Sequence, residues 1–304
     1  MPFGLETQWD DPAFAGRFIS QAARLKAYSL NPTVALKLAD RLAIGGGIDV
    51  RFASVSIERA VPLVDPFTFK VVDVGRADLS SGTATKLTFN LGVLARPSEA
   101  LSVGLSYRHK ATMDFDGDAT FSQVPTGDAQ IDARVAGILP AGGVPITTSI
   151  GFPAVLSGGV AYAWEAWKAE IDVNWYQWSS FDRIALTFEG RPDLDQVIEE
   201  AYENSLQYRL GVERRLTDVW TVRGGYFYDA SPAPPESVSP LLPDTGRHGL
   251  AVGGTWRSGP LRVDGAAWGV LGRNRSTEGV NRDRFDGSYS SFALTLGVFV
   301  GYAF

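Results

Sequence analysis

The chain has 304 residues, of which 45% are hydrophobic and 20% charged, and its mean hydropathy is −0.02. This composition excludes a disordered chain, and no apolar stretch has the roughly 18 residues that a membrane-spanning helix needs. A net charge of −6 argues against a nucleic-acid partner, and zero Cys with two His excludes thiolate nucleophiles and cysteine-based zinc sites.

The N-terminal segment, Met1–Leu5, has neither a basic region nor an apolar region of the kind that starts a secretory signal. The sequence therefore leaves two readings open. Either the protein stays inside the cell, or this chain is a fragment of a longer one.

Downstream, apolar residues recur at every second position, which predicts about eleven β-strands. The predicted strands cover residues 34–38, 42–50, 87–93, 101–107, 156–162, 167–175, 206–212, 220–228, 250–256, 261–267 and 292–304. The last of them alternates Phe, Leu, Val and Tyr with mostly small residues. An all-β fold follows from this period.

The two faces of the predicted strands differ in polarity. In segment 167–175 the residues between the apolar positions are Lys168, Glu170, Asp172 and Asn174. Both a transmembrane barrel and a soluble sandwich would show this alternation, so the lengths of the connections decide between these two folds. Short connections of about three to five residues alternate strictly with long ones over residues 60–85, 115–148, 188–203, 230–247 and 273–287. This alternation is typical of an up-and-down transmembrane barrel. Tryptophans near the strand ends fit an interfacial girdle.

An odd number of strands creates a problem for closure. Antiparallel closure requires an even number of strands, and eleven would leave the first and last strands running in the same direction. We therefore expect an incomplete barrel that lacks strands at its N-terminal side, with Phe3–Trp9 as the end of a preceding strand.

Several short motifs occur in a fixed order along the whole chain. They are Phe3-Gly4-Leu5 followed by Trp9 and Asp10-Asp11, Ile57-Glu58-Arg59, Tyr107-Arg108, Asp114-Phe115, Trp178-Ser179 with Phe181, Tyr208-Arg209, Tyr228-Asp229-Ala230-Ser231-Pro232-Ala233-Pro234, Pro243-Asp244 with Arg247, and the terminal Tyr302-Ala303-Phe304. In this order they resemble the FadL-type family of outer-membrane transporters for long-chain fatty acids and aromatic hydrocarbons.

The resemblance implies a barrel of fourteen strands plugged by an N-terminal hatch. Residues 1–304 would then form one barrel domain that supplies the fourth to the fourteenth strand, without the signal peptide, the hatch and the first strands. It also implies location in the bacterial outer membrane, contact with outer-membrane lipid and lipopolysaccharide, and recognition of Phe304 by the barrel-assembly machinery.

The function implied is passive diffusion of hydrophobic compounds, with long-chain fatty acid or hydrocarbon as ligand and no cofactor. Apolar side chains in the first two long loops are expected to capture the ligand: Phe67, Phe69, Phe121, Ile138 and Leu139. The alternative for these loops is that they pack on one another or cap the lumen.

An arginine is expected to anchor a ligand carboxylate, because a guanidinium binds a carboxylate with two parallel hydrogen bonds. Arg59 is the first choice, since the family places an arginine of this motif in its pocket, and Arg209 is the second. The alternative is a structural pair with Asp172, Glu213 or Asp264. Glu199-Glu200 stands where the family has a lysine, which would weaken anion binding and favour neutral hydrocarbons.

Two other functions stay open from the residues alone. A general porin would pass small polar solutes, and a soluble β-sandwich would bind a ligand on its loops. Enzymatic activity is not expected, because the two histidines lack a nucleophile motif such as G-x-S-x-G. No metal site is expected either.

Overall fold

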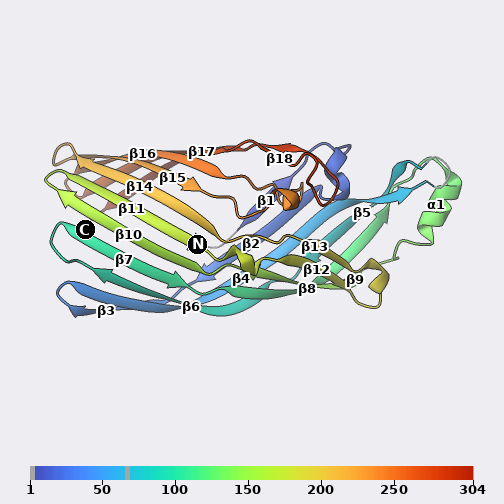
Figure 1. Cartoon of the computed structure of the whole chain (residues 1–304), viewed down its shortest axis with the longest axis horizontal. Coiled ribbons are helices and arrows are strands. Elements are labelled where there is room, and N and C mark those ends of the chain that lie inside the picture. Colours follow the sequence, from blue (N-terminus) through green and yellow to red (C-terminus); the bar gives the residue numbers. More distant parts are fainter. Residues whose placement is uncertain (1–3, 66–68, 304) are drawn as a thin grey trace.

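The structure, a computed structural model, describes residues 4–65 and 69–303. It consists almost wholly of antiparallel strands that lie side by side and curl round an interior (Figure 1). Phe67 and Phe304, named above, lie outside the described residues. None of the helices in the described ranges has the length and the apolar character needed to cross a membrane.

The described residues form twenty strands and one α-helix. The strands are β1 (Leu5–Gln8), β2 (Ala22–Leu30), β3 (Thr33–Ala39), β4 (Leu42–Val64), β5 (Val71–Ser81), β6 (Ala84–Ala95), β7 (Leu101–Arg108), β8 (Ala111–Gln123), β9 (Val144–Phe152), β10 (Val155–Trp164), β11 (Trp167–Tyr176), β12 (Arg183–Phe188), β13 (Gln196–Glu199), β14 (Ser205–Arg215), β15 (Trp220–Asp229), β16 (Arg247–Ser258), β17 (Leu261–Gly272), β18 (Arg275–Ser276), β19 (Ser288–Tyr289) and β20 (Phe292–Tyr302). Helix α1 is Ala129–Ala136.

Eleven runs of strand form the wall in the described part of the chain, as the sequence predicts. Four of these runs consist of two consecutive strands each, namely β2–β3, β5–β6, β7–β8 and β9–β10. β2 and β3 pair with β4, β4 pairs with β5 and β6, these pair with β8 and β7, and β8 and β7 pair with β9 and β10. From there the wall continues through β11, β14, β15, β16, β17 and β20. Every ladder is antiparallel, so the up-and-down topology is confirmed.

The connections alternate between short and long. Glu165 and Ala166 join β10 to β11, and Gly259 and Pro260 join β16 to β17. Glu165 and Gly259 take positive φ angles of 48° and 56°, which tight two-residue turns require. The short turns gather at one end of the sheet, and the long loops and α1 gather at the other (Figure 1). We call these the short-turn end and the loop end.

Two of the predicted long loops are mostly strand. The sequence predicts loops over residues 60–85 and 115–148, whereas β4, β5, β8 and β9 extend through much of both. Along these extensions, pairing runs from Ser56 with Ser80 to Val64 with Val71, with a shift of register between Val61 and Pro62, and from Ala111 with Phe152 to Ala119 with Val144. The wall therefore reaches well beyond the predicted strand ends at the loop end.

The outward face of the wall is apolar near the short-turn end. On β11, Ile171 is 59% exposed, while Glu170 and Asp172 on the opposite face line an internal cavity. Trp164 and Trp167 stack with ring centroids 6.3 Å apart beside a short turn, where an interfacial girdle is expected. Apolar side chains outside and polar ones inside are the arrangement of a membrane barrel, not of a sandwich with a dry middle.

At the loop end the pattern reverses, and apolar side chains fill the interior. The buried cluster includes Met113, Phe115, Ile146, Ile150 and Leu79 from the wall. The β12–β13 hairpin adds Ile184, Leu186 and Phe188 to it. This cluster is the hydrophobic core of the chain.

β1 pairs antiparallel with β2 from Leu5 with Leu25 to Gln8 with Ala22, as expected for the end of a preceding strand. Beyond this short pairing, the two edges of the sheet stay open among the described residues. β20 pairs with β17 along one side, and Val298 and Phe299, on its opposite faces, are 73% and 70% exposed. β3 is exposed along its whole length and pairs with β4. Both strands run toward the short-turn end, so they cannot pair antiparallel with each other.

Candidate ligand-binding site

An apolar cavity of about 360 Å³ lies inside the wall at the loop end. Leu25, Val55 and Ile57 line it from β2 and β4, and Phe181 and Tyr202 line it from the segments that flank the β12–β13 hairpin. The rings of Phe181 and Tyr202 meet nearly perpendicularly with centroids 4.9 Å apart. Aliphatic and aromatic walls of this kind suit a hydrophobic ligand.

One side of this cavity carries charge. Arg247 lines it together with Asp229 and Asp244. The Arg247 guanidinium lies 3.4 Å from the Asp229 carboxylate and 3.7 Å from that of Asp244. Both carboxylates therefore neutralise this arginine. Arg24, which also lines the cavity, is paired with Glu6 and Glu58, so the charges at the cavity are paired.

The loop over residues 230–246 covers the cavity. Arg275 of β18 holds this loop by donating to the Ala233 carbonyl at 2.6 Å and to the Ser231 hydroxyl at 2.6 Å. Trp9, near the other end of the chain, donates its indole N–H to the Pro240 carbonyl at 3.0 Å. The cover is therefore fixed by segments far apart in the sequence.

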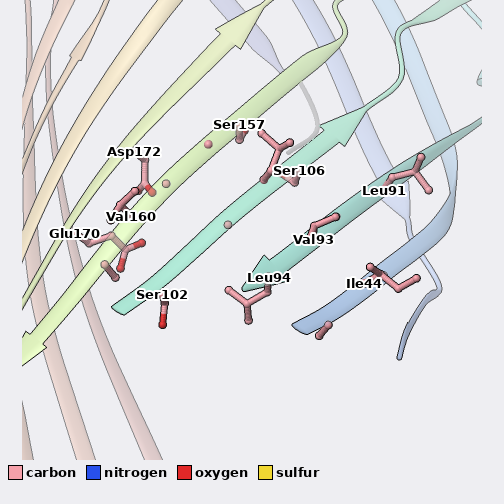
Figure 2. A pocket seen from close by; sticks show the side chains of 18 of the residues that line it. Ile44, Leu91, Val93, Leu94, Ser102, Ser106, Ser157, Val160, Glu170 and Asp172 are labelled. Carbon is pink, nitrogen blue, oxygen red and sulfur yellow. The ribbon is translucent and has the colours of Figure 1, made fainter. Parts of the chain in front are cut away.

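A second cavity, of about 690 Å³, lies nearer the short-turn end. Its lining is mixed, with Leu91, Val93 and Val160 beside polar side chains, but it carries more polar groups than the first, and we call it the polar cavity. Figure 2 shows Ser102, Ser106, Ser157, Glu170 and Asp172 on neighbouring strands of its wall. Asn90, Asn174, Lys168 and Arg209 also line it. These polar side chains can hydrogen-bond water and polar solutes.

Arg59, the first predicted anchor, lies on the inward face of β4, two positions beyond the buried Ile57. Its cross-strand neighbour is Ala77 of β5, which is also buried. The ion pairs found among the described residues do not include Arg59. It is not among the residues that line the 360 Å³ cavity.

Arg209, the second predicted anchor, points inward from β14, because its neighbours Tyr208 and Leu210 are exposed on the outer face. The Arg209 Nε donates to Gln207 Oε1 at 2.6 Å, and its register partner is Asp172. It lines the polar cavity. The structure thus places the two arginines in different parts of the interior.

The predicted loop residues separate in the same way. Phe69 is 80% exposed at the tip between β4 and β5, and Ile138 is exposed just after α1. Phe121 packs against the core from β8, and Leu139 is half-buried. The structure does not bring these four side chains together in one pocket.

Glu200, noted as a departure from the family, is buried at the loop end with 1% of its surface exposed. Burial, and after it the charge of Asp283, raises the pKa of this carboxyl to about 8, while Arg282 opposes the shift. Burial therefore favours the protonated form of this carboxyl. The repulsion of a ligand anion that the sequence suggests is thereby reduced.

Sequence reasoning missed the residues of the apolar cavity. Phe181, Asp229 and Arg247 belong to motifs that the resemblance picks out, but nothing in their spacing shows that they meet. Among the described residues, no group of three or more acidic or histidine side chains is placed to hold a metal ion.

Comparison with known proteins gives a consistent result. The family model described as outer membrane protein transport protein (OMPP1/FadL/TodX) matches residues 1–304. Outer membrane protein P1 of Haemophilus influenzae is 25% identical over 86% of this chain and 59% of its own length. The long-chain fatty acid transport protein of Escherichia coli O6:H1 is 24% identical over 99% of this chain and 72% of its own.

Solved structures share the fold. A FadL homologue of Pseudomonas aeruginosa superposes with a TM-score of 0.79 at 21% identity, over 98% of this chain and 71% of that one. The toluene transporter TbuX of Ralstonia pickettii gives 0.69 at 18% identity, over 99% and 76%. The chain spans about three fifths of the length of the Haemophilus protein and of a Salmonella typhi fatty acid transport protein.

Proposed function

Since this chain belongs to the outer membrane protein transport protein family (OMPP1/FadL/TodX), a family of bacterial outer-membrane barrels, we propose that it carries hydrophobic compounds across the outer membrane. The compounds are long-chain fatty acids or aromatic hydrocarbons, and they move by passive diffusion through the interior. The process needs no cofactor and no catalytic step.

The apolar cavity of about 360 Å³ is the observation that carries this proposal. A wall with an apolar outer face and a polar inner face needs no such cavity in order to pass water-soluble molecules. A cavity lined by Leu25, Val55, Ile57 and Phe181 instead gives a hydrocarbon a place to leave water inside the barrel.

The capture of ligand from outside is assigned to the exposed apolar residues of the loop end. Phe69 and Ile138 are the exposed members of the predicted set. Arg59 remains our first choice for the ligand carboxylate, with Arg209 second, and Phe121 and Leu139 support the loops from beneath.

The partners proposed outside the barrel are lipid, lipopolysaccharide and the barrel-assembly machinery. The outward apolar band supports the contact with lipid. Outer-membrane barrels with this topology carry such a band between aromatic girdles. The last two partners are assigned by family resemblance, the machinery through Phe304.

The polar cavity of about 690 Å³ favours a second candidate, a porin for small polar solutes. Its wall carries serine, asparagine and charged side chains, which can form hydrogen bonds to a polar solute. The two candidates make opposite predictions for uptake, so one experiment separates them.

The test is uptake by whole bacterial cells that express the full chain in their outer membrane. Tritiated oleate and toluene are compared with a small labelled sugar. We expect faster uptake of oleate or toluene and unchanged uptake of the sugar. Faster sugar uptake with unchanged oleate and toluene would favour the porin and contradict the proposal.

A further inference from the structure

Two aromatic side chains face the interior from the wall between the apolar cavity and the short-turn end. Phe227 of β15 points inward, because it lies two positions from Asp229, which lines the apolar cavity. Trp268 of β17 contacts it, with ring centroids 5.9 Å apart and ring planes at 63°. We call Phe227 and Trp268 the aromatic pair.

The aromatic pair offers apolar surface to the interior. Trp268 keeps 45% of its surface exposed, and Phe227 is half-buried. Trp268 does not lie at the open edge of the sheet, because β20 pairs with β17 beyond it. The interior of a membrane barrel is ordinarily polar, so an apolar ligand that covers these rings gains from the water it displaces.

The backbone beside the aromatic pair leaves room for such a ligand. Gly249 faces Phe227 across the β15–β16 ladder, and a Cβ at this position would overlap the Phe227 ring. The ring therefore lies flat over the backbone of β16 and does not stand out into the interior. Any side chain at position 249 would displace it.

The strip of wall that continues from Trp268 is open as well. Its successive partners across β16, β15 and β14 are Ala251, Gly225 and Gly211, none larger than a methyl group. A Cβ at Gly211 would meet no atom within 4 Å. Three strand spacings of about 4.8 Å make this strip about 14 Å wide, enough to seat a benzene ring beside Trp268.

The aromatic pair continues the apolar cavity toward the short-turn end. Asp229 and Arg247, which face each other across the β15–β16 ladder, line that cavity. Phe227 and Gly249 face each other two residues further along the same strands, about 7 Å at about 3.3 Å per residue. A ligand that leaves the cavity toward the short-turn end therefore meets the aromatic pair next.

The charges around the aromatic pair compensate one another. On its short-turn side, Arg223 lies 2.6 Å from Glu213. On the far side of β15, Arg209 and Asp172 face each other across the β11–β14 ladder. This arrangement favours an uncharged ligand at the aromatic pair.

We propose that Phe227 and Trp268 bind the ring of an aromatic hydrocarbon at a second site, one step from the apolar cavity toward the short-turn end. This inference rests on the proposed function, and it names aromatic hydrocarbons as the class that the site prefers. A flat ring packs against both exposed rings, and aromatic contacts of this kind stabilise a complex beyond the burial of apolar surface.

The test uses tryptophan fluorescence of the full chain folded in detergent micelles, because bromine atoms quench a tryptophan that they contact. The difference between wild type and Trp268→Phe gives the signal of Trp268. Trp178 lines the apolar cavity, and Trp178→Phe gives its signal in the same way. The probes are bromobenzene and bromocyclohexane, which share a six-carbon ring and differ in aromaticity, and dibromostearic acid as a reference for the cavity.

We expect saturable quenching of Trp268 by bromobenzene, with the free probe concentration corrected for uptake into micelles. Half-saturation should require at least about threefold less bromobenzene than bromocyclohexane, since only the aromatic probe gains ring contacts. Phe227→Leu keeps an apolar side chain but removes the ring, and should abolish this preference. Tyr226→Leu, the neighbouring ring on the outer face, is the matched control and should preserve it.

Heat-modifiable gel migration shows whether each variant is folded. Saturable quenching of Trp178 by any of the probes, with none of Trp268 by bromobenzene, would overturn the inference and leave the proposed function standing. Equal half-saturation of Trp268 by bromobenzene and bromocyclohexane would also overturn it. If no probe quenched either tryptophan, the proposed function would fail and the inference with it.

Discussion

The two predicted anchors differ in how far the protein has already used their hydrogen-bonding capacity. Arg209 donates to Gln207, which also accepts from Asn174 at 3.0 Å, so it belongs to an internal polar network. Arg59 stands among buried apolar neighbours, and no ion pair found in the described ranges includes it. A ligand carboxylate would gain more from Arg59, because that guanidinium has fewer competing partners.

We therefore expect Arg59→Ala to weaken fatty-acid binding by about tenfold or more, since a hydrogen bond to a charged group contributes about 1.5–3 kcal/mol. Barrel assembly should be unaffected. The measurement is oleate affinity in detergent, with heat-modifiable gel migration as the folding control. An unchanged oleate affinity would remove Arg59 from the site.

Glu200 gives the loop end a dependence on pH. Its carboxyl has a pKa of about 8 in the fold against an ordinary value of 4.5, because burial disfavours the charged form. Between these two pH values the folded chain holds the proton more tightly than the unfolded chain does. The stability that the bound proton of Glu200 contributes to the fold is therefore fully present below about pH 4.5 and is lost as pH rises through about 8.

The prediction is that Glu200→Gln flattens this loss. Limited proteolysis at increasing temperature detects unfolding of the loop end. In wild type, the unfolding temperature measured in this way should be lower at pH 9 than at pH 5. The variant should show a smaller shift. Glu189→Gln, at an exposed site, is the matched control and should behave like wild type. Identical shifts in wild type and Glu200→Gln would contradict the assignment.

At the scale of single strands, β4 shows what the sequence could and could not predict. Near the short-turn end its apolar residues point outward, as Ile44 and Ile48 do. Near the loop end they point inward, as Val55 and Ile57 do. The apolar positions thus change from even to odd numbers along one continuous strand.

This change of phase explains the predicted strand ends. A simple period of two stops at Val50, although the strand continues to Val64. The physical cause is the surroundings of the wall, which change from an apolar exterior with a polar interior to the reverse. Eleven strands and their order follow from period and loop length, whereas the extensions require knowing where that change occurs.

The ladder between the strand runs β5–β6 and β7–β8 is interrupted near its middle. Regular pairing ends at Ser81 with Gly117 and resumes at Asn90 with Arg108. Gly117 stands at the edge of this interruption, and a Cβ there would lie 2.1 Å from the Ser80 carbonyl oxygen. Only glycine lets the two backbones approach so closely.

Gly117→Val should therefore destabilise the barrel by about 1–3 kcal/mol, the usual effect of overpacking. Gly104→Val, on β7, is the control, because a Cβ at Gly104 meets no atom within 4 Å. The measurement is the temperature at which each variant loses its heat-modifiable folded form. An equal loss for both variants would show that Gly117 is not a tight contact.

At the scale of the whole molecule, the apolar cavity depends on contacts between distant parts of the chain. Leu25, Ile57, Phe181 and Arg247 line one space although they come from four regions of the sequence. Period and motif give the face of each residue but not its distance from the others. The polar lining of β11 was predictable from alternation, and the apolar cavity was not.

The open edges belong to the same scale. β3 and β20 run in one direction, so antiparallel pairing would require an odd number of strands between them. Relatives in the family are longer than this chain, which spans 59% of one and 72% of another. The proposed function therefore includes the expectation that further strands close the wall between β3 and β20.

The central claim is that apolar side chains face lipid while polar side chains of the same strand face an aqueous interior. The chain contains no Cys, so single cysteines carrying nitroxide labels can report this strand by strand in bilayers. At positions 170 to 173 of β11, we predict that labels at 171 and 173 collide with dissolved oxygen, and labels at 170 and 172 with a water-soluble nickel chelate. The opposite pattern, or labels at 171 and 173 shielded from both reagents, would contradict the account.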